Sequence, residues 1–358
     1  MDEELIKLSL IPSIGPKTFF KLMDYFGTVQ KIFESDRQTF KYELRMKDKV
    51  IDSIYKYKNA DINPYINKLN VNNIKLITYY DDKYPETLKN IPDPPPVLYV
   101  KGNEDILNEM GISVVGSRYC TYYGRQMSQE FSARLSEMGF TIISGMARGI
   151  DSQAHRGAIS INGKTIAVLG SGLDVIYPKE NRTLYEEITK KGAVISEFPL
   201  GTQPFKQNFP QRNRIISGLG IGVLVVEAGV KSGSLITASL ALEQGKEVFA
   251  IPGNINNKTS KGTNKLIKDG AKIVTTLDDI LEEYEMRNDL KEKIEDQRVK
   301  NLSKKLIKVL NYVNNEPTNI NMIANASGIR MHELIPMMNS LVLTGYIKEL
   351  PGKFFVKI

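Results

Sequence analysis

The stretch ISVVGSR at residues 112–118 decides the fold, because a short apolar run ends there in a glycine turn that leads to an arginine. The same order returns in TIISGMARGID at 141–151, and TIAVLGSGLD at 165–174 also runs into glycines. Apolar runs of this length are typical of strands buried on both faces of a parallel sheet. We therefore expect an open α/β sheet whose loops gather at the carboxyl ends of its strands, where such folds bind ligands.

Strands and helices alternate between residues 105 and 285, which predicts a parallel, doubly wound sheet. Helices are expected at 124–137, 181–190 and 235–244. The segment 209–218, FPQRNRIISG, reads as a further proline- and glycine-bearing turn, and residues 74–102 read as an extended bridge into the sheet. The expected strands are 112–115, 141–144, 165–169, 193–196, 223–227, 247–251 and 272–274.

The two ends of the chain predict smaller modules on either side of a main domain at 71–285. Residues 1–70 read as a helical module of helix-hairpin-helix or SAM-like type, and IPSIGPK at 11–17 is its turn. Backbone N–H groups of such a turn can face a DNA phosphate, although a turn used only for packing is an equal interpretation. Residues 286–302 are charged and predict a linker. Residues 303–358 predict a helix-turn-helix followed by a β-hairpin, the pattern of a winged-helix domain. Whether either end module binds DNA stays open.

Composition sets further limits. Lys and Arg number 48 against 41 Asp and Glu, and this net charge of +7 suits a polyanionic partner but equally fits an ordinary basic protein. The single cysteine rules out an intramolecular disulfide and agrees with a reducing compartment. With only two histidines besides, a zinc site of nitrogen and sulfur ligands is not expected. The sequence holds no secretory signal and no apolar run of about 18 residues, so we expect a cytoplasmic protein with no membrane association.

Familiar catalytic motifs do not match. The sequence GKT at 163–165 precedes an expected strand instead of following one, so it is not a P-loop. The turn at 170–172 has Val175 where the third glycine of a dinucleotide fingerprint would stand, so a bound NAD is not expected. Asp151 and His155 could face each other across a helical turn, but a helix cap and a hydrogen-bonded histidine are the favoured interpretation. We expect no enzyme, no catalytic residue, no metal and no cofactor.

Basic side chains in and beside the strand-end turns favour an anion, phosphate above all, because glycine lets the backbone approach and arginine binds phosphate in a bidentate manner. Aromatic side chains interleaved with them suit a single-stranded nucleic acid, whose bases stack on aromatic faces. A surface salt bridge for each base and core packing for each aromatic are the alternatives. The phosphate-binding candidates are Gly116, Ser117, Arg118, Gly145, Arg148, Lys179, Lys206, Arg212, Arg214, Ser232, Gly233, Ser234 and Lys261, and the base-stacking candidates are Tyr119 and Phe209.

The order of these turns resembles the DNA-processing protein A (DprA/Smf) family over about residues 75–280. The resemblance rests on Gly116-Ser117-Arg118, SGMARGID at 144–151, FPQRNRIISG at 209–218 and SGSLITA at 232–238, among others. It implies an extended Rossmann-like domain that binds single-stranded DNA and forms a homodimer. It also implies a role in natural transformation or homologous recombination, in which the protein protects incoming single strands and helps load the RecA recombinase.

The resemblance also implies roles for particular residues. Arg118 would contact a phosphate and Phe209 a base. Gln211 departs from the family at a position that is sometimes basic, which would leave more of the phosphate contact to Arg212. The basic pocket of the family carries over to Lys179, Lys206, Arg212 and Lys261.

A second hypothesis is an enzyme that acts on a small nucleotide. The expected fold resembles that of the lysine-decarboxylase-like phosphoribohydrolases, which cleave the N-glycosidic bond of nucleoside monophosphates. Glu227 would be its acid, since it ends an expected strand just before Ser232-Gly233-Ser234. The Pro-Gly-Gly-x-Gly-Thr loop of that family is missing from this sequence. The hypothesis predicts release of free base from AMP-like substrates.

Overall fold

A computed structural model describes residues 3–285, 304–314, 316–343 and 346–357. Its largest feature within these ranges is a nine-stranded sheet with the strand order β1-β2-β6-β5-β4-β3-β7-β8-β9. The strands are β1 (Lys75–Thr78), β2 (Val97–Gly102), β3 (Gly111–Val115), β4 (Thr141–Ser144), β5 (Thr165–Val168), β6 (Ala193–Ser196), β7 (Gly222–Val225), β8 (Glu247–Ala250) and β9 (Lys272–Ile273). All seven predicted strands are present, with ends that shift by at most two residues.

The sheet is parallel from β6 through to β9, and it is doubly wound about β3. From β3 the chain steps outward through β4, β5 and β6, and then returns to the other side of β3 as β7, β8 and β9. The point where the direction reverses therefore lies between β3 and β7, the position at which open α/β sheets bind ligands. The predicted bridge contributes β1 and β2, which pair antiparallel with each other and with β6 at one edge.

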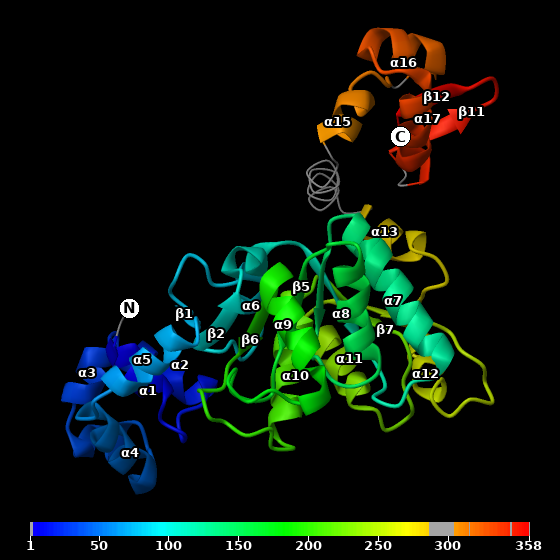
Figure 1. Ribbon diagram of the computed structural model, residues 1–358. Helices are drawn as coiled ribbons and strands as arrows, with labels where there is room; N and C mark the ends of the chain where they lie inside the picture. The colour runs from blue at the N-terminus through cyan, green and yellow to red at the C-terminus, as the bar shows by residue number, and fades with distance from the viewer. Residues whose placement is uncertain (1–2, 286–303, 315, 344–345, 358) are drawn as a thin grey trace.

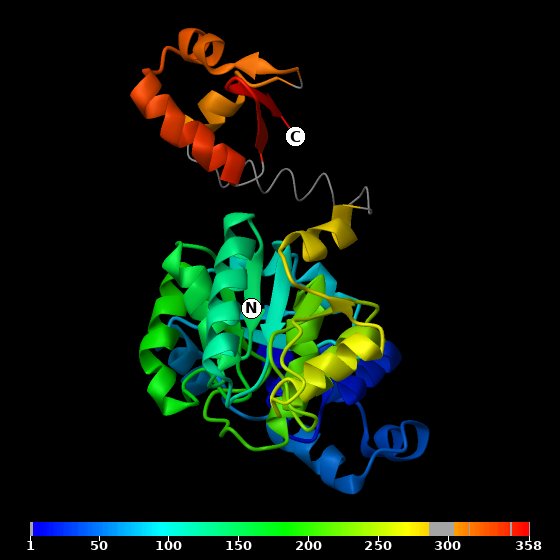
Figure 2. The same ribbon diagram turned by 90° about the vertical axis from the view of Figure 1, so that its right-hand side faces the viewer.

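Helices cover both faces of this sheet (Figures 1 and 2). One face carries α7 (Tyr122–Glu137), α8 (Ile150–Ser160) and α9 (Arg182–Lys191), and the other carries α10 (Asn208–Leu219) and α11 (Gly233–Glu243). The prediction of a turn at 209–218 was wrong, because this segment is helix α10. Pro210 is compatible with that helix since it stands in the first turn, where its missing N–H has no intrahelical partner to lose.

Residues 3–71 form a set of helices that shares a hydrophobic core with the sheet. Phe19 and Leu69 belong to the same buried cluster as Tyr99 of β2 and Tyr185 of α9. Lys68 also pairs with Asp174 at 2.7 Å. These helices are therefore packed onto the main domain. They are α1 (Glu3–Ser9), α2 (Pro16–Phe26), α3 (Val29–Glu34), α4 (Asp48–Lys58) and α5 (Asn63–Val71), with a π-helical turn at Thr39–Glu43.

The C-terminal residues have a buried core of their own, which includes Val309, Ile323, Leu334, Met338 and Phe355. The predicted linker at 286–302 lies outside the described residues. No helix in the described parts of the chain is long and apolar enough to span a membrane. The remaining elements are α6 (Glu86–Lys89), α12 (Lys261–Lys268), α13 (Asp278–Glu285), α15 (Lys304–Leu310), β10 (Thr318–Asn319), α16 (Ile320–Ser327), α17 (Met331–Leu343), β11 (Ile347–Leu350) and β12 (Phe354–Lys357).

Candidate functional site

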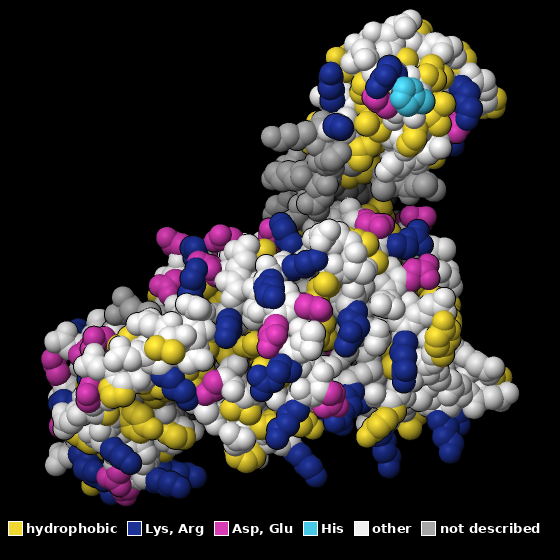
Figure 3. Space-filling view, viewed as in Figure 1, with side chains coloured by type: hydrophobic (Ala, Val, Ile, Leu, Met, Phe, Trp, Pro, Cys, Tyr) yellow, Lys and Arg dark blue, Asp and Glu magenta, His cyan; other side chains and the backbone are white. Residues whose placement is uncertain are grey.

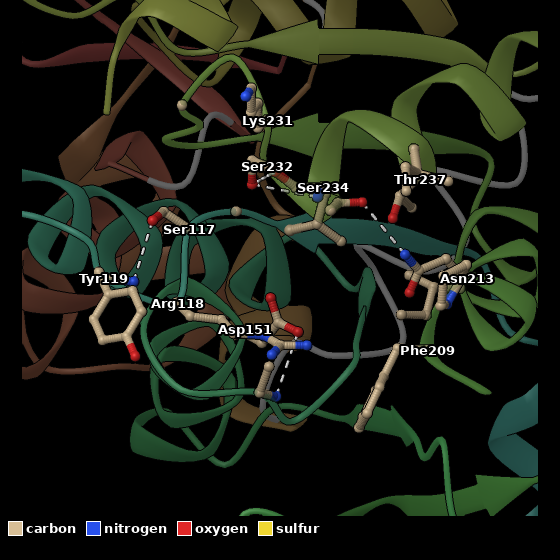
Figure 4. A pocket seen from close by; sticks show the side chains of 18 of the residues that line it. Ser117, Arg118, Tyr119, Asp151, Phe209, Asn213, Lys231, Ser232, Ser234 and Thr237 are labelled. Carbon is tan, nitrogen blue, oxygen red and sulfur yellow. Dashed lines mark hydrogen bonds between the residues drawn. The ribbon is translucent and has the colours of Figure 1, made fainter. Parts of the chain in front are cut away.

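A cavity of about 1000 Å³ opens at the carboxyl ends of β3 and β7, where the winding of the sheet reverses. Among the described residues that line it, five side chains are basic and one is a carboxyl, that of Asp151 (Figure 4). Basic side chains also protrude from the edge of the molecule that carries α10 and α12 (Figure 3). The cavity therefore suits an anion. Its basic lining residues are Arg118, Lys206, Arg212, Lys231 and Lys258.

The Gly116-Ser117-Arg118 turn forms one wall of this pocket directly after β3. The Ser117 amide donates to the carbonyl of Glu227 at 2.7 Å, so the turn is fastened to the end of β7. A Cβ atom on Gly116 would lie 2.5 Å from a side-chain carbon of Ile150 and 2.9 Å from the Glu227 carbonyl oxygen, which leaves room for glycine alone. The fastened turn presents the exposed Arg118 side chain to the pocket.

The start of helix α11 supplies backbone donors to the same pocket. Ser232 caps the helix by accepting a hydrogen bond from the Ser234 amide at 3.4 Å, and the two hydroxyl oxygens lie 2.8 Å apart. An added Cβ atom on Gly233 would meet no atom within 4 Å, so its backbone faces open space. Unsatisfied N–H groups and the helix dipole make such an end attractive to anions.

Arg212 lies beneath the pocket and is only 4% exposed. Its Nη1 donates to the carbonyl of Gly145 at 2.9 Å and also to that of Val168. Burial lowers the pKa of Arg212 to about 10, and the nearby Asp151 opposes that shift. Burial likewise raises the pKa of Asp151, against the charges of Arg212 and Arg118. Arg212 thus adds positive charge to the floor of the pocket. Its guanidinium is buried, so it is not the exposed phosphate contact that the sequence predicted.

Gly145 belongs to this buried layer. A Cβ atom there would lie 2.7 Å from Nη2 of Arg212 and 2.8 Å from Oδ2 of Asp151. Its role is to leave room for the two charged side chains, and it does not itself line the main pocket.

Most of the predicted site residues do meet at this place. Lys206, Phe209 and Tyr119 line the pocket together with the turn and the start of α11. Tyr119 is 81% exposed, whereas Phe209 is half-buried. Arg148 lines a small adjoining cavity with Arg118 and is paired with Glu180.

Besides Gly145 and Arg148, three further predicted residues do not line the pocket. Lys179 and Lys261 are exposed but do not line it. Arg214 is buried in an ion pair, with Nη1 2.6 Å from Oε1 of Glu197 and Nε 3.0 Å from Oδ2 of Asp93. Arg214 follows Arg212 by two residues along α10. Because its guanidinium is paired inside the protein, it is not accessible to a ligand in the pocket.

Several lining residues were not predicted. Lys231 directly precedes the Ser232-Gly233-Ser234 turn, so its place beside a helix start could have been found from the sequence. Lys258 lies in a polar loop without a motif. Tyr177 and Asn213 lie in segments that resemble the family, Asn213 within FPQRNRIISG, but neither was singled out as a site residue. Asn213 joins two helices, since its side-chain amide donates to the Gly233 carbonyl at 3.4 Å.

The residues considered for catalysis have structural partners. Nδ1 of His155 lies 2.6 Å from the Thr165 hydroxyl, and burial together with the charge of Arg212 lowers the pKa of His155 to about 3. Glu227 is 2% exposed and is not among the lining residues. One of its carboxylate oxygens accepts from the amide of Thr121 at 2.9 Å and from its hydroxyl at 3.2 Å, and the other accepts from the Thr259 hydroxyl. Glu227 therefore fastens two strand-end loops to each other.

The fold and the pocket define a class: α/β proteins with a mostly parallel, doubly wound sheet and a basic cleft at its switch point. The family model for DNA recombination-mediator protein A matches residues 75–285, and this chain belongs to that family. The resemblance noted in the sequence is thereby confirmed, and so is the α/β fold.

Relatives and solved structures agree with this membership. Protein Smf of Escherichia coli is 40% identical over 288 residues, which cover 79% of this chain and 77% of that protein. DNA processing protein DprA of Streptococcus pneumoniae is 49% identical over 205 residues, covering 57% and 72%. Its X-ray structure superposes with a TM-score of 0.70 at 38% identity, over 79% of this chain and 98% of that one. A Helicobacter pylori DNA processing protein A, described for its single-stranded DNA binding mode, has a TM-score of 0.53 at 30% identity over 58% and 94%.

Proposed function

We propose that this protein binds single-stranded DNA in the pocket between β3 and β7 and carries out no chemistry on it. The observation that carries this proposal is the set of unpaired cations at the pocket. In the part of the chain that the structure describes, Arg118, Lys206, Lys231 and Lys258 make no ion pair, whereas Arg148 and Arg214 nearby are paired with glutamates. Cations without an acidic partner are available to phosphate groups.

Two further observations support single strands over other anions. Tyr119 and Phe209 stand among the cations, and base stacking on an aromatic ring contributes about 1–3 kcal/mol per base. The similar Helicobacter pylori protein is described as binding single-stranded DNA. The proposed mechanism is neutralisation of the backbone by the four cations and the start of α11, with stacking that tolerates any sequence.

Binding to single and double strands separates this proposal from general attraction to polyanions. Fluorescence anisotropy with a labelled homothymidine oligonucleotide and with a duplex of equal length is expected to show much tighter binding to the single strand. Equal affinity for both would contradict a site built for unpaired bases.

We further propose that the protein acts as a homodimer which protects incoming single strands and helps load the RecA recombinase in transformation or recombination. Its membership of the recombination-mediator family supports this role. The test is the lag before RecA hydrolyses ATP on DNA coated with single-strand-binding protein. This lag should shorten when the protein is added, and an unchanged lag would contradict the loading role. Light scattering at several concentrations gives the oligomeric state.

The C-terminal module enters the proposal with a role of its own. The order of α15, α16, α17, β11 and β12 supports a winged helix at 303–358. Its basic residues are partly neutralised, because Arg330 pairs with Glu333 and Lys353 with Glu349, each at 2.7 Å. This favours a contact with protein over a contact with DNA for that module.

The phosphoribohydrolase hypothesis lacks comparable support, since both carboxylate oxygens of Glu227 hold loops together outside the pocket lining. Incubation of the pure protein with AMP and other nucleoside monophosphates is expected to release no free base. Release that disappears in a folded Glu227→Gln variant would instead make the protein an enzyme.

A further inference from the structure

The pocket has a second basic side, whose two lysines were not predicted from the sequence. Lys231 lies in the loop between β7 and α11, and Lys258 lies in the loop between β8 and α12. Figure 4 shows Lys231 at the end of the pocket opposite Phe209, with Ser232, Ser234 and Arg118 between them. A ligand that reaches both Phe209 and Lys231 must therefore cross the start of α11.

This side is as available to a ligand as the first. Both lysines are exposed, and neither forms an ion pair with another residue in the described ranges. Two exposed uncharged side chains line the same pocket. Val230 is 59% exposed and directly precedes Lys231, and Tyr119 is 81% exposed and lies next to Ser117 and Arg118 (Figure 4). Lysines and an exposed aromatic ring in one pocket are the combination that binds the backbone and bases of a single strand.

The loops that carry these residues are fastened to one another. The carboxylate of Glu227 accepts from Thr121 on one loop and from Thr259, the neighbour of Lys258, on another. The Gly262 amide donates to the Ala228 carbonyl at 2.7 Å, which ties the start of α12 to the loop that holds Lys231. Binding at this wall thus needs little ordering of the backbone, which lowers its entropic cost.

The size of the cavity leaves room for a ligand beyond one nucleotide. Its volume of about 1000 Å³ lies at the upper end of the range of about 300–1,000 Å³ found for pockets that enclose a drug-sized molecule. We infer that the strand is held in two segments. An inner segment lies against Arg118, Lys206 and Phe209, and an outer segment runs over Tyr119 beside Lys231 and Lys258. This inference rests on the proposed binding of single-stranded DNA.

A short oligonucleotide can fill only the inner segment, whereas a long one reaches both. Comparing the affinities for the two lengths therefore tests the inference. Affinities are measured for homothymidine oligonucleotides of about 4 and about 16 nucleotides, the span covered by known single-strand-binding modules. The double variant Lys231→Ala/Lys258→Ala should bind the short oligonucleotide like the wild type. It should lose most of the additional affinity for the long one. For the long oligonucleotide, the slope of log K against log salt should fall by about 1.4, since each phosphate contact on a single strand contributes about 0.7.

A matched control variant removes the same number of positive charges at positions outside the pocket. Arg134 on α7 and Lys190 on α9 are exposed and do not line the cavity, so Arg134→Ala/Lys190→Ala should leave both affinities and the slope near those of the wild type. For the aromatic part, Tyr119→Phe should retain the affinity for the long oligonucleotide, and Tyr119→Ala should reduce it.

Each contrary outcome has its own meaning. If the lysine variant binds the long oligonucleotide like the wild type, or loses affinity equally at both lengths, the outer segment does not exist. An equal loss in the control variant would also overturn it, because net charge alone would then explain the effect. If the wild type binds no single strand at either length, the proposed function itself fails. Loss of binding in Arg118→Ala but not in the lysine variant retains the function and removes only the outer segment.

Discussion

The guanidinium carbon of Arg118 lies 5.2 Å from the centre of the Phe209 ring. A cation at this distance from an aromatic ring is attracted to it, by about 0.5–1 kcal/mol at an exposed site. Arg118 comes from the turn after β3 and Phe209 from the first turn of α10, so the contact joins two walls of the pocket. Phe209 therefore orients the cation that we expect to meet a phosphate.

This contact predicts that the two residues act together in binding. Arg118→Ala and Phe209→Ala should each weaken binding of single-stranded DNA, the second by about 1–3 kcal/mol if a base stacks on the ring. The double variant should lose less than the sum of the two, by about 0.5–3 kcal/mol, because each single variant already breaks the contact. Anisotropy titrations of the four proteins measure this coupling, and strictly additive losses would show that Phe209 does not orient Arg118.

For Gly233→Ala we expect opposite effects on protein stability and on DNA binding. Gly233 is the first residue of α11, and an added Cβ atom would meet nothing within 4 Å. Gly233→Ala should keep or raise the free energy of unfolding, by up to about 1 kcal/mol, because alanine loses less backbone entropy in a helix. The added methyl group should nevertheless weaken DNA binding by obstructing the approach of a phosphate to the helix start. Denaturation and anisotropy measure the two effects, with Ser239→Ala on the exposed side of α11 as the control. Unchanged affinity in Gly233→Ala would place the phosphate elsewhere.

For a substitution of Arg214 we expect the reverse, a loss of stability without a loss of DNA binding. Its side chain is 4% exposed and that of its partner Glu197 is 7% exposed. Removal of one member of a buried ion pair costs about 3–5 kcal/mol, since the other charge is left without a partner. Arg214→Met should lose stability on that scale in urea denaturation, while the protein that remains folded binds single strands like the wild type. A folded variant with weaker binding and a lower salt slope would restore Arg214 to the DNA site, as the sequence suggested.

The lowered pKa of His155 should make the stability of the protein depend on pH. Burial lowers its pKa to about 3 in the folded protein, whereas an unfolded histidine has a pKa of about 6.5. Below pH of about 6.5 the unfolded chain takes up a proton that the folded protein does not. Stability therefore falls as the pH falls towards 3, by up to about 1.4 kcal/mol per pH unit from this residue.

The variant His155→Asn removes the titrating group and can still reach the Thr165 hydroxyl. Its free energy of unfolding should be lower at neutral pH but should decline less steeply between pH of about 6 and 4. Urea denaturation across this range compares the two slopes, which also contain the effect of carboxyl groups in both proteins. Identical slopes would mean that His155 is protonated in the folded state.

The sequence predicts the central strands well because β3 to β7 are short runs of buried residues covered on both faces, and the carboxyl ends of β3 and β7 mark the site. It fails at α10, where Pro210 and Gly218 indicate a turn although a proline in a first helical turn does not prevent a helix. The burial of Arg212 and Arg214 could not be predicted either. Their partners, the Gly145 carbonyl and Glu197, reach them only through the tertiary fold. Lys258 has the same limitation, because only the folded loop brings it beside Lys231.

One binding experiment decides whether the pocket between β3 and β7 holds single-stranded DNA. The affinity of the wild type and of Arg118→Ala for a labelled homothymidine oligonucleotide is measured across a salt series, with Arg134→Ala as a control of equal charge. We predict strong binding that weakens with salt, a large loss in Arg118→Ala, and a slope of log K against log salt that is smaller by about 0.7 in that variant. Tight binding that Arg118→Ala leaves unchanged, in both affinity and slope, would contradict the assignment of this pocket as the DNA site.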